Sequence, residues 1–270
     1  MSRVSESGAY TTSVAIGGLP IGIASDSPEF IRMLEKRYAG FLGVADDAAI
    51  QLEVDLVPPA PSGDDEELAV GRAGRRWTMS RGDFRADWDP VSNRGRVRQA
   101  AYPYAIDSVM RIVHSLILAE RGGFLLHAAS AIRGGRAFIF SGVSGAGKTT
   151  ISRLAPSDVT LLTDEISYVR KMDGGYRAFG TPFAGDLGRP GENLAAPIAA
   201  LYFLAKGSRD AARPLAGSGA ARRLLRNILF FADDRALVEK LFRTACDFVS
   251  SVPVYELTFR LGPGVWDLIR

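Results

Sequence analysis

The chain has 270 residues, of which 47% are hydrophobic and 23% charged, and its formal net charge at pH 7 is +3. These values are typical of a globular protein with one large or two modest domains. No apolar run approaches the ~18 residues that span a bilayer, so we expect no membrane partner. Residues 1–12 lack the apolar stretch of a secretory signal, and Cys246 is the only cysteine, so a cytoplasmic location fits best.

Residues 1–104 are predicted to form a small α/β domain. Alternation of apolar and polar residues indicates the strands, and Ser27 before Pro28 is typical of a helix N-terminus. The expected elements are strands at 10–16, 20–24, 50–56, 77–80, 84–88 and 95–101, and a helix from Pro28 to about Tyr38.

Residues 105–270 are predicted to form the second domain. It begins with a helix over 105–121, in which apolar residues recur at helical spacing until Gly122-Gly123. A hairpin turn is expected at Gly134-Gly135. The other expected elements are strands at 124–130, 136–140, 159–162, 199–205 and 254–259, and helices at 219–231 and 234–249.

Residues 142–149, GVSGAGKT, form a complete G-x-x-x-x-G-K-[ST] phosphate-binding motif. The run that precedes it predicts a strand and the run that follows predicts a short helix, which is the required context. Glycines let the backbone N–H groups turn toward phosphate oxygens, Lys148 supplies positive charge, and the Thr149 hydroxyl can bind Mg²⁺. The motif predicts a nucleoside triphosphate site that contains Gly142, Ser144, Gly145, Ala146, Gly147, Lys148, Thr149 and Thr150.

Two further features are candidates for the same site. Asp164 and Glu165 end the apolar run 160–163, on a strand expected to adjoin the loop strand, where one acid would hold Mg²⁺ and the other would accept a proton. The alternative is a pair of solvated turn carboxylates. His127 lies on the strand before the loop, and taken alone it is as well explained as a hydrogen-bonded core residue.

The segment 125–169 resembles the nucleotide-binding core shared by HPr kinase/phosphorylase and ATP-dependent phosphoenolpyruvate carboxykinase. Both families have a histidine on the strand before the loop and an acidic pair on the next strand; here His127 precedes Lys148 by 21 residues and Asp164 follows it by 16. The resemblance implies a carboxykinase-like P-loop core, with Lys148 and Thr149 at the phosphates and metal. It also implies that Asp164 and Glu165 hold the metal and activate a hydroxyl, and that His127 lies beside the reacting phosphate.

The chain departs from these families in three ways. Glu165 replaces the second aspartate of the usual pair, which leaves open which acid is the base. The glutamate–arginine signature of HPr kinases is not recognisable, and a glycine-rich segment at 180–188 follows instead. That segment is either a turn linker or a substrate loop in which Asp186 supplies the missing acid. The N-terminal part does not resemble the regulatory domain of HPr kinases, so HPr is not the expected substrate.

The resulting hypothesis is an ATP- and Mg²⁺-dependent kinase that transfers the γ-phosphoryl group to a hydroxyl, most simply a serine of a small protein or peptide. The alternatives are a small-molecule hydroxyl kinase and a regulatory module that senses ATP without transferring phosphate. The sequence leaves open the acceptor, the reverse reaction and the oligomeric state, a homo-oligomer included.

Arginines cluster at three places. We expect most of them on solvated faces and strand edges. Because no aromatic-rich or other nucleic-acid motif accompanies them, we expect no nucleic-acid partner, and phosphate handling near one cluster is the more economical functional interpretation. The clusters are Arg72, Arg75 and Arg76; Arg94, Arg96 and Arg98; and Arg222, Arg223 and Arg226.

Overall fold

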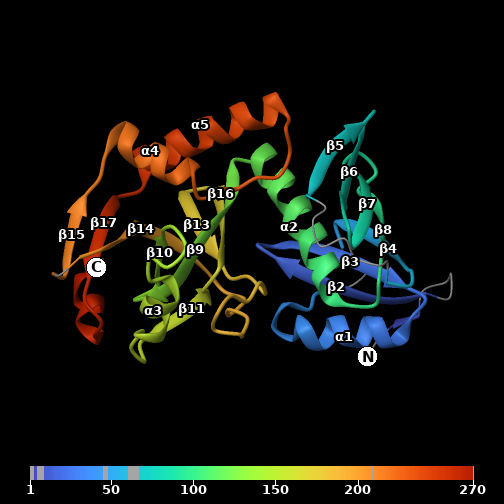
Figure 1. The fold of residues 1–270 in the computed structure, drawn as a ribbon, viewed down its shortest axis with the longest axis horizontal. Helices are drawn as coiled ribbons and strands as arrows, with labels where there is room; N and C mark the ends of the chain where they lie inside the picture. Colours follow the sequence, from blue (N-terminus) through green and yellow to red (C-terminus); the bar gives the residue numbers. More distant parts are fainter. Residues whose placement is uncertain (1–2, 5–8, 45–47, 60–66, 208, 270) are drawn as a thin grey trace. The chain divides into compact units, whose positions relative to one another are not determined.

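The computed structural model describes residues 3–4, 9–44, 48–59, 67–207 and 209–269. The chain is a mixed α/β protein with two sheets, which confirms the general fold class (Figure 1). It divides into two compact units, Met1–Leu116 with Phe231–Asp234 and Ile117–Phe230 with Arg235–Arg270. The division lies inside helix α2 (Pro103–Glu120), which the sequence analysis placed in the second domain. Within the described residues, no helix is long and apolar enough to cross a membrane.

The first unit contains an eight-stranded sheet in the order β1-β2-β3-β4-β8-β7-β6-β5. Its strands pair antiparallel except for β3 with β4 and β4 with β8, which are parallel; α1 lies in the crossover that connects β3 to β4. The elements are β1 (Arg3–Val4), β2 (Tyr10–Ile16), β3 (Leu19–Ser25), α1 (Pro28–Arg37), η1 (Ala39–Phe41), β4 (Ile50–Leu56), β5 (Ala69–Ala73), β6 (Arg76–Arg81), β7 (Phe84–Asp89) and β8 (Arg94–Gln99).

Helix α1 begins where the sequence predicts. The Ser27 hydroxyl accepts a hydrogen bond from the Phe30 N–H over 3.2 Å, and Pro28 occupies the first turn, where no N–H is required. Phe30, Ile31 and Leu34 are buried on the face toward β2 and β3. Strand β5 was not predicted, because its side chains are mostly exposed and show no apolar alternation.

The second unit contains the phosphate-binding motif and a nine-stranded sheet. Its elements after α2 are β9 (Gly123–Arg133), β10 (Arg136–Ser141), α3 (Lys148–Arg153), β11 (Val159–Thr163), β12 (Ile166–Met172), β13 (Gly175–Phe179), β14 (Ala195–Lys206), β15 (Ala211–Pro214), α4 (Gly217–Leu225), β16 (Ile228–Leu229), α5 (Arg235–Ser251), β17 (Val254–Phe259) and η3 (Pro263–Leu268).

Strand β9 organises this sheet. Along one edge it pairs with β10 and then β16, and along the other with β11 and then β12. The pairings β10-β9-β12-β13-β14 close into a ring, because β14 also pairs parallel with β10. The left-handed Gly134 and Gly135, with φ of 56° and 74°, form the predicted turn between β9 and β10.

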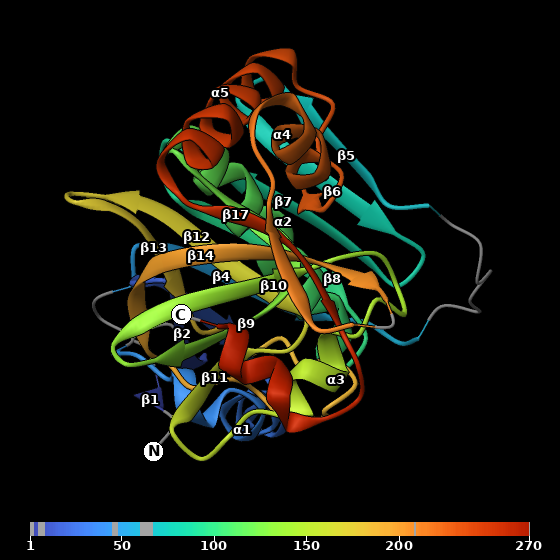
Figure 2. The same cartoon turned by 90° about the vertical axis from the view of Figure 1, so that its left-hand side faces the viewer.

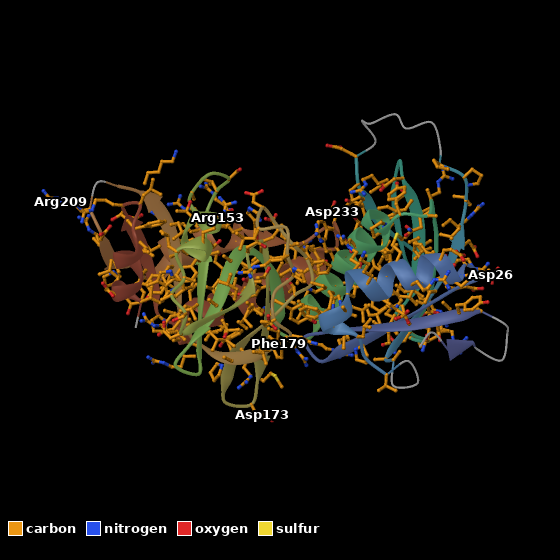
Figure 3. All side chains as sticks on the ribbon, turned by 90° about the horizontal axis from the view of Figure 1, so that it is seen from below. Asp26, Arg153, Asp173, Phe179, Arg209 and Asp233 are labelled. Atoms are coloured by element: carbon orange, nitrogen blue, oxygen red, sulfur yellow. The ribbon has the colours of Figure 1, made fainter. Side chains whose placement is uncertain are left out.

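Two expectations for this unit were wrong. The acid-bearing strand β11 does not adjoin the loop strand β10, since β9 lies between them and β14 holds the other edge of β10. The helix predicted over 219–231 ends at Leu225, because the chain then turns to pair β16 with β9. The hairpin of β12 and β13, with Asp173 at its tip, was not predicted (Figure 3).

A buried aromatic cluster lies next to α3, the helix that follows the phosphate-binding motif. Phe140 on β10 stacks on Tyr202 of β14 and meets Trp266 of η3 edge to face. The Trp266 indole N–H donates to the Ile151 carbonyl of α3 over 3.1 Å, so η3 lies beside α3 (Figure 2). The short helix that follows the motif is therefore held on the sheet by side-chain packing.

Candidate functional site

The backbone of the motif requires its glycines. Gly145 and Gly147 have φ of 73° and 109°, in the left-handed region that glycine tolerates best. A Cβ at Gly142 would lie 2.8 Å from the Ala146 Cβ, and one at Gly147 would lie 3.0 Å from the Phe259 ring. Of the other predicted nucleotide contacts, Ser144 is exposed and Thr150 is half-buried at the start of α3.

The side chain of Lys148 is buried over the loop, with 8% of the residue exposed. Its ammonium donates to the carbonyls of Gly142 and Val143 over 3.0 and 3.4 Å. Burial lowers its pKa, an effect opposed by the negative charges of Glu165 and Asp186. The ammonium is therefore held by the loop and feels the charge of two carboxylates.

Thr149 contacts Asp186, the acid whose role the sequence left open. Its hydroxyl donates to the Asp186 carboxylate over 3.1 Å. Among the described residues there is no group of three or more His, Cys, Asp or Glu side chains that could hold a metal ion. Two oxygen donors nevertheless suit Mg²⁺, which keeps several waters and takes its remaining ligands from nucleotide phosphates.

Asp164 is buried, and both oxygens of its carboxylate accept hydrogen bonds from backbone N–H groups. Oδ1 accepts from the Gly185 N–H over 2.9 Å and Oδ2 from the Leu187 N–H over 2.8 Å. These two bonds hold the segment that carries Asp186, which is the acid that Thr149 contacts. The turn that precedes Glu165 is fixed by the Thr163 hydroxyl, which accepts from the N–H groups of Glu165 and Ile166.

His127 and Glu165 contact each other near Lys148 of the loop. His127 Nδ1 lies 3.5 Å from Glu165 Oε1, and the two side chains are 30% and 35% exposed. Burial and the nearby Lys148 charge lower the pKa of His127, against the opposing effect of Glu165. The imidazole is therefore favoured in its neutral form beside a partly solvated carboxylate.

The sheet explains why these residues converge. The His127 N–H donates to the Asn227 carbonyl over 2.8 Å, and its own carbonyl accepts from the Ser141 hydroxyl over 3.0 Å. On the other edge of β9, the Ala128 N–H donates to the Glu165 carbonyl over 3.0 Å. Ser141, just before the loop, and Glu165, just after β11, are therefore hydrogen-bonded to adjacent residues of β9.

Gly185 lies over both acids. A Cβ there would be 2.8 Å from Glu165 Oε2 and 2.9 Å from Asp164 Oδ2, so this position has no room for a side chain. The structure thus brings together His127, Lys148 and Glu165, and separately joins Thr149 to Asp186. The contacts of Asn227 and Phe259 were not predicted, because no local pattern marks residues that act through distant backbone or ring packing.

A cavity of about 530 Å³ adjoins the site at Asp164. Arg153 and Arg189 are exposed cations on its wall, and its volume is in the range that holds a small organic ligand. The remaining wall consists of Ser152, Ala155, Val159, Thr160, Leu161, Thr163, Leu187, Pro190, Gly191 and Glu192.

The fold and site therefore define a mixed α/β protein with a phosphate-binding-loop motif. Residues 104–270, more than half of the chain, match the family described as SynChlorMet cassette protein ScmC. The chain belongs to this family. No curated protein shows significant similarity to it.

Proposed function

We propose that this protein is an ATP- and Mg²⁺-dependent kinase with an HPr kinase/phosphoenolpyruvate carboxykinase-like P-loop core. It transfers the γ-phosphoryl group to a hydroxyl, most simply a serine of a small protein or peptide. The observation that carries the proposal is the contact between His127 and Glu165, 3.5 Å apart, beside Lys148 of the loop. Nucleotide binding alone does not need a histidine paired with a carboxylate at that place.

The contacts favour different roles for the two acids of the pair. Both oxygens of Asp164 already accept backbone N–H groups, so Asp164 is a positioning residue for the segment 185–187. Glu165 is more exposed and its contact is the neutral His127, so Glu165 is the general base. Thr149 and Asp186 are the residues that would hold Mg²⁺, which supplies positive charge to the phosphate oxygens.

In this mechanism the Glu165 carboxylate takes the proton of the acceptor hydroxyl. The acceptor oxygen forms a bond to the γ-phosphorus, and the bond from that phosphorus to the β–γ bridging oxygen breaks, which leaves ADP. Lys148 neutralises charge that develops on the phosphate oxygens. His127 orients Glu165 and donates toward either the carboxylate or the moving phosphoryl group.

The test is incubation of the full chain with γ-labelled ATP, Mg²⁺ and the peptides and small proteins encoded beside its gene. We expect label on a serine with wild-type protein and none with Glu165→Gln, whose fold and ATP binding are checked separately. ATP binding without transfer to any acceptor, and with no effect of Glu165→Gln on nucleotide turnover, would favour the sensing module instead.

The cavity beside Asp164 favours a second candidate, a small-molecule hydroxyl kinase. A cavity of about 530 Å³ with Arg153 and Arg189 on its wall suits a small anionic acceptor. The substitutions Arg153→Ala and Arg189→Ala separate the two candidates. They would raise the KM of a small anionic acceptor and leave that of a peptide unchanged.

A further inference from the structure

A groove of about 440 Å³ lies between α4 and α5 in the second unit. Its apolar surface comes from Ala221 and Leu225 of α4 and from Phe242 and Cys246 of α5. The two helices pack against each other at this edge of the unit (Figure 2).

The wall formed by α5 is a stripe of apolar side chains that the fold leaves uncovered. Phe242 is 52% exposed, and Val238, one turn earlier, is 46% exposed. Cys246, one turn later, continues the stripe, since residues four apart share a helix face. The core-facing side of α5 is separate and comprises the buried Leu237, Leu241, Ala245 and Phe248. Packing against the core of the unit therefore gives no reason for a large apolar side chain at position 242.

The wall formed by α4 adds positive charge. Arg222 and Arg226 line the groove four residues apart, and both are exposed. Their neighbour Arg223 pairs with Glu256 over 2.6 Å, whereas no acidic side chain in the described part of the chain is paired with Arg222 or Arg226. An apolar floor with two unneutralised guanidinium groups at its rim is complementary to an acidic amphipathic segment.

The position of the groove links it to the candidate site. Arg226 immediately precedes Asn227, whose carbonyl accepts the His127 N–H. Strand β10 leaves the edge of β9 at Ala128, and β16 takes over that edge at Leu126. The end of α4 therefore meets β9 at the point where the phosphate-binding loop begins.

We propose that this groove docks an acidic amphipathic segment of the peptide or small protein that carries the acceptor hydroxyl. That this partner carries the acceptor hydroxyl rests on the proposed kinase function, whereas the docking itself does not. Apolar residues of the segment contact Phe242 and Leu225, and its carboxylates pair with Arg222 and Arg226. Such a segment would hold the acceptor beside His127 without occupying the nucleotide loop.

The probe is a fluorescein-labelled helical peptide of about 16 residues, with leucines spaced three and four apart among glutamates. Its fluorescence anisotropy is measured with the full chain and no ATP. Phe242→Ser and the double change Arg222→Glu, Arg226→Glu should each weaken binding by at least about tenfold. Leu261→Ser, at a residue 87% exposed elsewhere in the unit, and Arg209→Glu, whose side chain projects from the edge of the unit (Figure 3), should leave it unchanged.

Three results would overturn the proposal. The first is peptide binding that is absent or insensitive to the groove variants. The second is groove-dependent binding to phosphatidylcholine–phosphatidylserine vesicles but not to the peptide, which would make the groove a membrane surface. The third is a dimer abolished by Phe242→Ser, which would make a second copy the occupant.

The variant Lys148→Ala separates this proposal from the proposed function. It should reduce ATP affinity at least about tenfold and retain peptide binding, because Lys148 does not line the groove. Failure of the kinase assay alongside groove-dependent peptide binding would leave docking intact and remove only the kinase function.

Discussion

The hydroxyl of Thr149 donates a hydrogen bond to the carboxylate of Asp186 over 3.1 Å, although 37 positions separate the two residues. Thr149 belongs to the phosphate-binding motif. Asp186 belongs to a glycine-rich segment held by two backbone hydrogen bonds to Asp164. The pair gives the proposed magnesium position two oxygen donors from different parts of the chain.

Asp186→Asn should therefore weaken Mg²⁺-dependent nucleotide binding. We expect the Kd of ATP with Mg²⁺ to rise at least about tenfold, because one anionic donor is lost, and the Kd measured in EDTA to change little. Titration calorimetry under both conditions measures this difference. Asp173→Asn, at the exposed tip of the β12–β13 hairpin (Figure 3), is the matched control and should bind like wild type.

Lys148→Ala should reduce ATP affinity at least tenfold, which corresponds to about 1.4 kcal/mol. The ammonium donates to two loop carbonyls and feels the charge of Glu165 and Asp186, so the change removes the cation without emptying an apolar core. Calorimetry of this variant is compared with Lys240→Ala, which removes an exposed lysine that pairs with Glu120. Equal ATP affinity in folded Lys148→Ala and wild-type protein would contradict a nucleotide site at the motif.

Glu165→Gln should slow phosphoryl transfer by roughly 10²–10⁴-fold, the range for a positioned acid–base group, and leave ATP affinity nearly unchanged. The amide keeps the shape of the side chain but cannot accept the acceptor proton. Transfer is measured with γ-labelled ATP, and nucleotide binding by calorimetry on the same preparation. Transfer at the wild-type rate would exclude Glu165 as the base.

Asp164→Asn should act first on stability and on the segment 185–187. An amide has one acceptor oxygen, so one of the two N–H groups of Gly185 and Leu187 loses its partner. Both N–H groups are partly buried, so the loss of one partner should cost at most about 1–3 kcal/mol, which urea unfolding measures. Hydrogen exchange should become faster at these two amides. Unchanged exchange together with lost transfer would instead indicate a direct chemical role for Asp164.

His127 should make the stability of the chain depend on pH. Burial and Lys148 lower the pKa of His127 in the folded state, so below about pH 6.5 the unfolded state binds more protons. The stability that neutral His127 contributes is present above that pH and is lost as pH falls through the folded-state pKa. The difference in unfolding free energy between wild type and His127→Asn should therefore be smaller at about pH 5.5 than at about pH 7.5.

Urea unfolding at the two pH values provides this measurement. Because every other titrating group is common to both proteins, the difference reports His127 together with its contact to Glu165. A difference that is equal at both pH values would show that the environment of His127 does not disfavour its charge.

Local chemistry in the sequence was enough to predict the phosphate-binding loop. Gly145 and Gly147 adopt left-handed backbone conformations that other residues rarely take, and the flanking strand and helix have clear residue patterns. The start of α1 was predictable for the same reason, because Ser27 caps residues only three positions away. In both cases the determining interactions lie within a few residues.

Only the tertiary structure decided which acid meets which residue. Strand β9 separates β10 from β11, so the sequence spacing of Asp164 did not reveal its contacts. Those contacts are the N–H groups of Gly185 and Leu187, and Thr149 contacts Asp186 instead. Side chains so far apart in sequence are brought together by strand pairing and loop closure, which depend on the whole sheet and leave no periodic signal in the residues themselves.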